Sequence, residues 1–204
     1  VFTDESGKEY TVSLKLKGKH NVYNSLVAIC IAKCLGVPVE EAVSACESYT
    51  GDSIRQNIFT LKNRNVTIID DAYNASYESM KASLEVLESF ENRKVAVLGD
   101  MLELGEYSDE YHYKVGKLCV EKGVDIVIAC GKYSRNIVEA VMESMLDNME
   151  NKKVCYAYYT QDAKEAAQKL MLMLQEGDCV LVKGSNAMKM GHVVEYLRES
   201  DVGI

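Results

Sequence analysis

From residue 66 onward, short apolar runs alternate with longer segments whose apolar residues recur every three or four positions. The short runs, rich in β-branched residues, are predicted to be buried strands; they cover residues 66–69, 95–98, 126–129, 154–158 and 179–182. The segments between them have the spacing of amphipathic helices, as with Met80, Leu84 and Leu87. This alternation predicts a parallel sheet covered on both faces. With right-handed crossovers, the fold is doubly wound and Rossmann-like.

The first fifty residues have a different pattern. Residues 11–17 alternate between apolar and polar side chains, which predicts a half-buried strand ended by Gly18. Asn21 is placed to cap a helix that Gly36 ends, and Pro38 opens a second, shorter helix. An opening strand without an earlier partner leads us to expect that the chain starts inside a domain.

Composition and charge narrow the classes of function. The chain has 204 residues and a net charge of −8, with its lysines and arginines scattered, so we expect no nucleic-acid partner. Its apolar runs are too short for a bilayer and its start lacks a signal sequence, so we expect no membrane association. Seven cysteines without a CxxC pair predict reduced thiols in a cytoplasmic protein. The three histidines are isolated from one another, so we expect no metal site.

Polar residues follow four of the predicted strands, at residues 70–74, 99–101, 131–132 and 183–186. Ligands of doubly wound sheets bind beyond the carboxyl ends of the strands. These clusters are therefore the first place to look for a binding site, although ionisable groups beside glycine are not specific to one chemistry.

Two of the candidate segments open helices. In residues 18–24, the carboxamides of Asn21 and Asn24 can recognise the edge of a purine, and the alternative is an ordinary helix cap. In residues 182–189, Lys183 and Ser185 precede free helix-start amides that can receive a carboxylate or a phosphate. The alternative there is a capped helix with a lysine that extends to solvent.

A pair of carboxylates ends the strand predicted at residues 66–69. Asp70 and Asp71 lie next to Tyr73 and Asn74, and together these groups can hold ribose hydroxyls or a magnesium-bound phosphate. The alternative is a loop in which Asn74 or Ser76 only caps the following helix.

An acidic loop follows the next predicted strand. Gly99 allows the backbone to approach a ligand closely, and Asp100, Glu103 and Glu106 can line an acidic pocket for a substrate ammonium group. The alternative is a solvated acidic loop before Ser108 caps the next helix.

Taken together and in order, these segments resemble a known family. The strings are GKHNVYN, DDAYNAS, VLGDMLELGE and VLVKGSNAMKM, with Arg55 after the first and His112 after the third. They are similar to the Mur ligases, and most similar to the branch that adds D-alanyl-D-alanine to UDP-N-acetylmuramoyl-tripeptide. The resemblance runs from about residue 18 to residue 197. VLGDMLELGE discriminates best, whereas HNVYN and the aspartate pair are shared with the wider superfamily, including folylpolyglutamate synthases.

The resemblance implies a three-domain enzyme of which this chain is the carboxy-terminal part. Residues 1–53 would be a remnant of the central ATP-binding domain, and residues 54–204 a Rossmann-like domain with a mostly parallel, six-stranded sheet. ATP with Mg²⁺ would convert the tripeptide carboxylate of UDP-MurNAc-peptide to an acyl phosphate, which the amine of D-Ala-D-Ala then attacks. A cytoplasmic monomer is expected, and the chain alone should not catalyse ligation.

The resemblance also implies roles for individual residues. Those on the nucleotide side would be His20, Asn21 and Asn24, with Asn24 beside the adenine. Arg55 would reach the γ-phosphate and act in catalysis with Asp71, which contacts the ribose or the phosphate end. The remaining candidates are Tyr73 and Asn74 beside Asp71, and Lys183, Ser185 and Asn186 around the incoming dipeptide.

Several positions depart from the family pattern. The sequence has no GxxxxGK[ST] phosphate-binding motif, Ser76-Tyr77 stands where the family has asparagine–proline, and Asn186 and Lys189 stand where it has arginines. Loss of an arginine fork weakens carboxylate recognition and puts dipeptide specificity in question. Two alternatives therefore remain, another Mur or folylpolyglutamate-type ligase and a non-catalytic nucleotide- or peptide-binding module. A Rossmann oxidoreductase is disfavoured because GxGxxG is absent.

Overall fold

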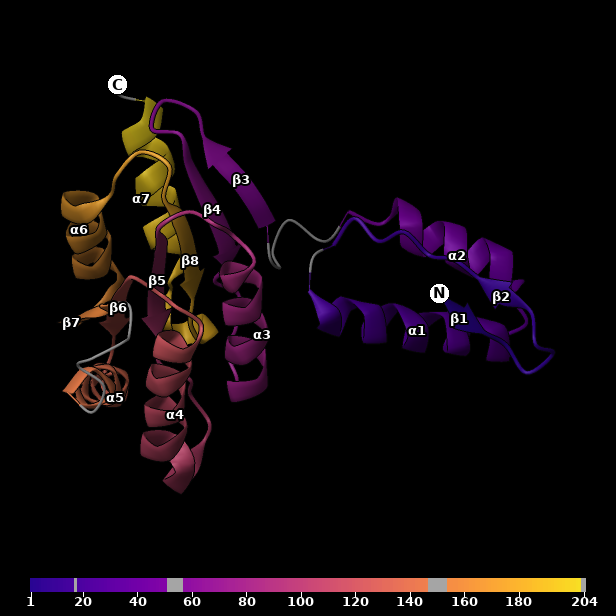
Figure 1. Ribbon diagram of the computed structural model, residues 1–204, viewed down its shortest axis with the longest axis horizontal. Helices are drawn as coiled ribbons and strands as arrows, with labels where there is room; N and C mark the ends of the chain where they lie inside the picture. Colours follow the sequence, from indigo (N-terminus) through magenta and orange to yellow (C-terminus); the bar gives the residue numbers. More distant parts are fainter. Residues whose placement is uncertain (17, 51–56, 147–153, 203–204) are drawn as a thin grey trace. The chain divides into compact units, whose positions relative to one another are not determined.

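The computed structural model describes residues 1–16, 18–50, 57–146 and 154–202. The chain divides into two compact units, Val1–Gly51 and Asp52–Ile204, here named the amino-terminal unit and the carboxy-terminal unit (Figure 1). The boundary predicted after residue 53 lies outside the described residues. Among the residues that are described, no helix combines the length and the apolar character needed to cross a membrane.

The amino-terminal unit contains a small sheet and two helices. Strands β1 (Phe2–Thr3) and β2 (Glu9–Tyr10) pair antiparallel, and helices α1 (Lys19–Cys34) and α2 (Val39–Ser48) follow. The strand predicted for residues 11–17 is wrong, because residues 11–16 form no strand. The backbone N–H of Ser13 donates instead to the side chain of Glu47 on α2, 2.9 Å away. Val12 of this segment packs against a cluster formed by Ile29 of α1 and Val39 and Ala42 of α2, so its apolar side chain is covered by helices and not by a neighbouring strand.

The start of α1 also differs from the prediction. Gly18, with φ 106°, occupies the N-cap position, so the helix begins two residues before Asn21. The N–H of Asn21 donates to the carbonyl oxygen of Gly18 within the first turn. Glycine adopts this left-handed backbone without a steric penalty, and it therefore fixes the helix start in place of a capping side chain. Ile29 is the one residue of α1 that is buried, whereas Val22 and Cys30 are exposed.

A six-stranded sheet organises the carboxy-terminal unit, with strand order β3-β4-β8-β5-β6-β7. All neighbouring pairs are parallel except β3 with β4, which confirms the mostly parallel, six-stranded fold. The strands are β3 (Asn57–Leu61), β4 (Val66–Asp71), β5 (Lys94–Gly99), β6 (Ile126–Cys130), β7 (Tyr156–Thr160) and β8 (Cys179–Lys183). Four of the five later strands begin within one residue of the predicted runs, and β7 begins two residues later than predicted. The edge strand β3 was not predicted.

Helices cover both faces of this sheet, as the doubly wound prediction requires. One hydrophobic cluster joins one face to α3 (Tyr77–Glu88), α4 (Ser108–Glu121) and α5 (Arg135–Leu146). The other joins the opposite face to α6 (Ala163–Met173) and α7 (Gly191–Val202). Short 3-10 turns, η1 (Gly105–Tyr107) and η2 (Asn186–Met188), precede α4 and α7. Because side chains alternate along a strand, Ile69 joins the first cluster and Ile68 the second.

The carboxyl ends of β4, β8, β5 and β6 lie side by side along one edge of the sheet. Two glycines allow the ends of β5 and β8 to approach each other beneath Met190. A Cβ atom on Gly184 would lie 2.6 Å from Cγ of Met190 and 3.0 Å from Cα of Gly99. These glycines therefore leave no room for a side chain at the centre of the edge where polar residues gather.

Candidate functional site

Three loops that leave the carboxyl ends of neighbouring strands are hydrogen-bonded to one another. They are named the β4 loop (72–76), the β5 loop (100–104) and the β8 loop (184–190). On one side of the β8 loop, the Ser185 N–H donates to the Asp100 carbonyl oxygen at 2.9 Å, and its Oγ accepts from the Leu102 N–H at 2.8 Å. On the other side, Nδ2 of Asn186 donates to the carbonyl oxygen of Tyr73 at 3.2 Å. The β8 loop thus connects its two neighbours.

A buried ion pair lies beneath the β4 and β8 loops. The Nζ atom of Lys183 is 2.5 Å from Oδ2 of Asp71 and donates to the carbonyl oxygen of Asn74 at 3.0 Å. Ser83 on α3 donates its hydroxyl to the same carboxylate oxygen at 2.6 Å. The Lys183 side chain is 2% exposed, and this burial lowers the pKa of its ammonium group, while Asp71 opposes the shift. The ammonium group of Lys183 therefore lies directly beneath the loops, with its charge balanced by the carboxylate of Asp71.

The two adjacent aspartates of β4 have different surroundings. Asp71 lies on the sheet face covered by α3, where it contacts Ser83 and Lys183. Asp70 points to the opposite face, and it accepts a long 3.4 Å bond from the N–H of Ala72. Burial raises the pKa of Asp70, and the N–H of Ala72 and the charge of Arg198 partly offset that effect. Both residues pair with β8 through the backbone, but of the two side chains it is that of Asp71 that binds Lys183 at the end of β8.

The carboxylate of Asp100 binds the loop that follows β6. Its carboxylate, in a residue only 3% exposed, accepts from the N–H groups of Tyr133 and Ser134 and from the Ser134 hydroxyl at 2.7 Å. Gly131 makes room for it, because a Cβ there would lie 2.6 Å from the carboxyl carbon. Glu103 is exposed and has a positive φ of 66°. The expectation that Asp100 and Glu103 receive a substrate ammonium group stays a prediction.

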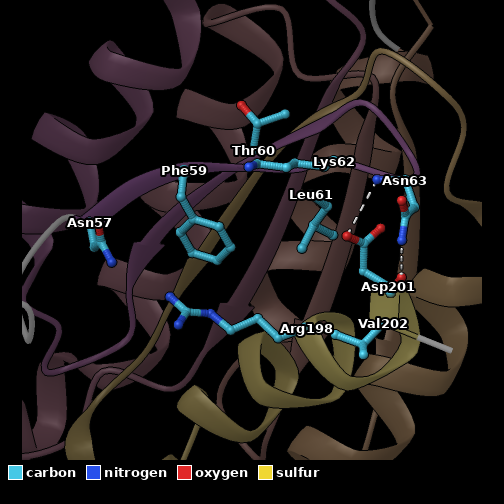
Figure 2. Close-up of a pocket in the computed structure, with 9 residues that line it drawn as sticks. All are labelled: Asn57, Phe59, Thr60, Leu61, Lys62, Asn63, Arg198, Asp201 and Val202. Atoms are coloured by element: carbon cyan, nitrogen blue, oxygen red, sulfur yellow. Dashed lines mark hydrogen bonds between the residues drawn. The ribbon is translucent and has the colours of Figure 1, made fainter.

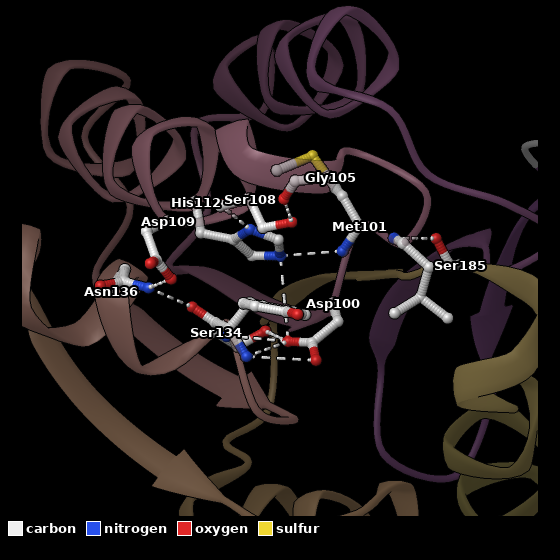
Figure 3. A network of polar contacts seen from close by, with 11 residues as sticks. Asp100, Met101, Gly105, Ser108, Asp109, His112, Ser134, Asn136 and Ser185 are labelled. Atoms are coloured by element: carbon white, nitrogen blue, oxygen red, sulfur yellow. Dashed lines mark hydrogen bonds and ion pairs between the residues drawn. The ribbon is translucent and has the colours of Figure 1, made fainter.

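The polar network around Asp100 includes His112, for which the sequence suggested no role (Figure 3). Its fully buried ring bridges α4 and the β5 loop: Nε2 faces the Met101 N–H at 2.8 Å, and Nδ1 faces the Ser108 carbonyl oxygen at 2.6 Å. Burial lowers the pKa of the imidazole below its ordinary value of 6.5. The only hint in the sequence was that His112 follows the most discriminating string. Ser83 had no such hint, because a serine inside a helix carries no distinctive pattern.

A separate groove of about 590 Å³ runs along β3 and the end of α7 (Figure 2). The guanidinium of Arg198 stacks over the ring of Phe59 at 4.1 Å, and Asn63 donates to Asp201 through its N–H and its amide. None of the residues proposed from the sequence lines this groove. Its lining comes from β3, the turn after it and the end of α7, so it is distinct from the strand-end loops.

Three of the candidate nucleotide residues belong to the amino-terminal unit. His20, Asn21 and Asn24 lie in the first turns of α1, and Asn24 is exposed, with its Nδ2 3.5 Å from Oδ1 of Asn21. Arg55 lies outside the described residues. Within the described ranges, no group of three His, Cys, Asp or Glu residues is arranged to hold a metal ion.

Comparisons with known proteins agree on one family. The family model for the Mur ligase, glutamate ligase domain, matches residues 55–186. The UDP-N-acetylmuramoyl-tripeptide--D-alanyl-D-alanine ligase of Bacillus subtilis is 33% identical over 196 residues, covering 95% of this chain and 41% of the relative. The ligase of the same name from Escherichia coli is 31% identical over 192 residues, covering 93% and 39%.

Solved structures give the same result. A MurF ligase from Thermotoga maritima in complex with ADP superposes with a TM-score of 0.75 at 27% identity, covering 95% of this chain and 42% of that one. A MurF from Acinetobacter baumannii superposes with a TM-score of 0.77 at 30% identity, covering 92% and 40%. The chain thus spans about two fifths of the length of the relatives it matches.

Proposed function

Because the chain belongs to the Mur ligase family, we propose that it is the carboxy-terminal part of a ligase that adds D-alanyl-D-alanine to UDP-MurNAc-tripeptide at the expense of ATP. The observation that carries this proposal is the 33% identity to a ligase of that name along 95% of the chain. In this proposal, residues 1–53 belong to the central ATP-binding domain and residues 54–204 form the carboxy-terminal domain. The protein would act in the cytoplasm as a monomer.

The proposed reaction has two steps. The tripeptide carboxylate attacks the γ-phosphorus of ATP, which gives an acyl phosphate and ADP. The free amine of D-Ala-D-Ala then attacks the carbonyl carbon; phosphate leaves, the nitrogen loses a proton and an amide bond remains. Mg²⁺ would neutralise phosphate charge; the described residues contain no group of three or more His, Cys, Asp or Glu side chains arranged to hold it.

The strand-end loops supply the proposed contacts with the incoming dipeptide. The Oγ atom of Ser185 accepts from Leu102, which leaves its single hydrogen available for donation to a substrate carboxylate. Asn186 is exposed beside it and offers a carboxamide, while the buried ammonium of Lys183 supports an anion electrostatically from below. Exposed Glu103 would face the amine end of the same ligand, and Asp100 would act on that amine only through its charge, because its carboxylate binds the loop after β6.

The nucleotide contacts are proposed for a second set of residues. Asp71 would contact the ribose or the phosphate end, with Tyr73 and Asn74 beside it, and Arg55 would reach the γ-phosphate. His20, Asn21 and Asn24 would lie on the adenine side. What supports the set is chemical type: exposed carboxamides that can donate and accept, and a carboxylate held at a strand end.

The test is an assay of the complete gene product that contains this chain. Purified protein is mixed with ATP, Mg²⁺, UDP-MurNAc-tripeptide and D-Ala-D-Ala, and phosphate release and the new amide are measured by colorimetry and mass spectrometry. We expect both products to depend on the dipeptide. Turnover with a single amino acid or with folate and glutamate instead would favour another ligase of the superfamily, and no turnover with any amine would favour a binding module.

Two further samples make the assay diagnostic. The 204-residue chain alone is expected to release no phosphate, because its sequence has no GxxxxGK[ST] motif; release by this chain would overturn that part of the proposal. Asn186→Ala in the complete protein should raise the KM for the dipeptide. Asn136→Ala, at a carboxamide on α5 that binds Asp109, is the matched control.

A further inference from the structure

His112 connects a helix to the loop that precedes the proposed dipeptide site (Figure 3). The two partners of its ring determine where its proton lies. The Met101 N–H can only donate, so Nε2 must accept, and the Ser108 carbonyl oxygen can only accept, so Nδ1 must carry the hydrogen. The imidazole is therefore neutral and has a single tautomer, with both nitrogens satisfied in a residue that is 0% exposed.

The residue next to Met101 carries this restraint to the β8 loop. Leu102 donates its N–H to Oγ of Ser185 at 2.8 Å. Glu103, the residue after it, has φ 66°, a left-handed conformation that is uncommon for residues other than glycine and is maintained by its surroundings. A loop with such a backbone needs fixed neighbours, and the bonds at Met101 and Leu102 supply two of them.

We propose that His112 is a positioning residue: its neutral ring fixes the backbone of Met101 and Leu102, and the Leu102 amide thereby orients the Ser185 hydroxyl toward the dipeptide carboxylate. The inference rests on the proposed function in taking Ser185 as a dipeptide contact. The restraint itself is a property of the described chain and can be measured without a substrate.

Protonation of His112 would break this arrangement. A hydrogen on Nε2 would face the donor N–H of Met101, and that N–H would lose its acceptor. The charged groups near the ring are Asp100 of the β5 loop, 3.8 Å from Nε2, and Asp109 of α4, and the ring of Tyr133 packs against it from the β6 side. Both carboxylates favour the charged form, yet burial outweighs them and lowers the pKa of His112. The loop should therefore stay ordered at neutral pH and loosen in acid.

Two substitutions separate the two ring nitrogens. His112→Gln can place its Oε1 near the position of Nε2 and still accept from Met101. His112→Asn can still donate to Ser108 from near the position of Nδ1, but it is too short to reach Met101. Packing is reduced in both variants, so a difference between them reports the bond to Met101. His192→Gln, at an exposed histidine of α7, controls for the loss of a histidine that lies away from the β5 loop.

The first measurement uses the 204-residue chain and nuclear magnetic resonance. In the wild type, the imidazole nitrogen shifts should show hydrogen on Nδ1 and none on Nε2; the opposite tautomer would overturn the proposal without any variant. Amide exchange at Met101 and Leu102 should be faster in His112→Asn by roughly 3- to 10-fold, the effect of one lost buried hydrogen bond. It should be close to wild type in His112→Gln. Equal exchange in the two variants would refute the restraint.

The second measurement uses the complete enzyme and the dipeptide kinetics. His112→Asn should raise the KM for D-Ala-D-Ala by roughly 3- to 10-fold with a smaller change in kcat. In His112→Gln the KM should stay close to that of the wild type. In a Ser185→Ala background, His112→Asn should add little, because the hydroxyl that it orients is gone. As pH falls below the ordinary imidazole value, the KM of the wild type should rise relative to that of His112→Gln.

The outcomes distinguish this inference from the proposed function. If the wild type ligates D-Ala-D-Ala but the KM is equal in His112→Asn and His112→Gln, the positioning role is wrong and the function stands. If the wild type does not ligate the dipeptide, the proposed function fails, and with it the role of Ser185. The exchange experiment would still decide whether His112 restrains the loop.

Discussion

Two adjacent carboxylates with different surroundings allow a matched test of the buried ion pair. Asp71→Asn keeps the shape of the side chain and an oxygen that can accept from Ser83, but it removes the charge beside Lys183. Asp70→Asn makes the same chemical change one residue earlier, on the other face of β4. We expect Asp71→Asn to destabilise the carboxy-terminal unit and Asp70→Asn to stabilise it slightly.

The magnitudes follow from burial. Removing one partner of a buried pair costs about 3–5 kcal/mol. The Lys183 side chain is 2% exposed and that of Asp71 is 15% exposed, so we expect a cost near the lower limit, about 3 kcal/mol, for Asp71→Asn. At Asp70, burial disfavours the charged form, so neutralisation should gain less than about 1 kcal/mol. The folded-state pKa of Asp70 is raised, so this gain is present at neutral pH and vanishes as the wild-type carboxylate protonates toward pH 3.8.

The chain has two units, and the assay must report unfolding of the carboxy-terminal one. The chain contains no tryptophan, so tryptophan fluorescence cannot serve as the probe. Cys179 begins β8 and is fully buried, so its alkylation in urea, followed by mass spectrometry of the labelled peptide, reports opening of the sheet. Lys183→Met on the Asp71→Asn background should recover most of the loss, because an apolar side chain needs no counter-charge. If Asp71→Asn and Asp70→Asn shift the urea midpoint equally, the ion pair does not stabilise the strand ends.

Three other predictions follow. Gly184→Ala should lower the thermal midpoint by several degrees in circular dichroism, since its Cβ would lie 2.6 Å from Cγ of Met190; an unchanged midpoint would mean that Met190 moves aside freely. Burial lowers the folded-state pKa of His112, so its contribution to stability is present above pH 6.5 and lost as pH falls through that pKa; urea midpoints at several pH values should show the loss in the wild type and not in His112→Gln. Burial raises the pKa of the Cys119 thiol, so a thiol reagent should modify exposed Cys30 within the native protein and Cys119 only after unfolding; equal rates would contradict the packing of α4.

Much of the fold could be predicted from local pattern. The buried strands are continuous apolar runs, and the helices between them have a clear apolar stripe, so five of the six strands were found. Strand β3 was missed because it lies at the edge of the sheet, where Asn57 and Thr60 interrupt the apolar residues. At residues 11–17 the pattern was present but the strand does not form. Alternating apolar and polar residues are not sufficient, because a strand also needs a neighbouring strand with which to pair.

The sequence predicted a candidate site at one edge of the sheet but not its internal contacts. Polar residues after the strands do gather at that edge, where Lys183 meets Asp71 and Ser185 follows Lys183 in the chain; that a ligand binds there stays a prediction. Their roles depended on partners: Asp100 was expected to face a substrate, yet its carboxylate binds the loop after β6. Side-chain type gives the chemistry that is available, and only the partner determines whether that chemistry is already in use.

The sequence by itself determined the five buried strands and the helices between them in the carboxy-terminal unit, and the family to which its ordered motifs belong. Burial of apolar side chains favours a strand or a helix according to their spacing. Apolar residues recur every second position in a half-buried strand and about every 3.6 positions in a helix, and this pattern can be read from the sequence. The tertiary structure decided the charge partner of Lys183, 112 residues away at Asp71, and the tautomer of His112. Those outcomes depend on which groups meet after the sheet has formed, because hydrogen bonds and desolvation act between neighbours in space.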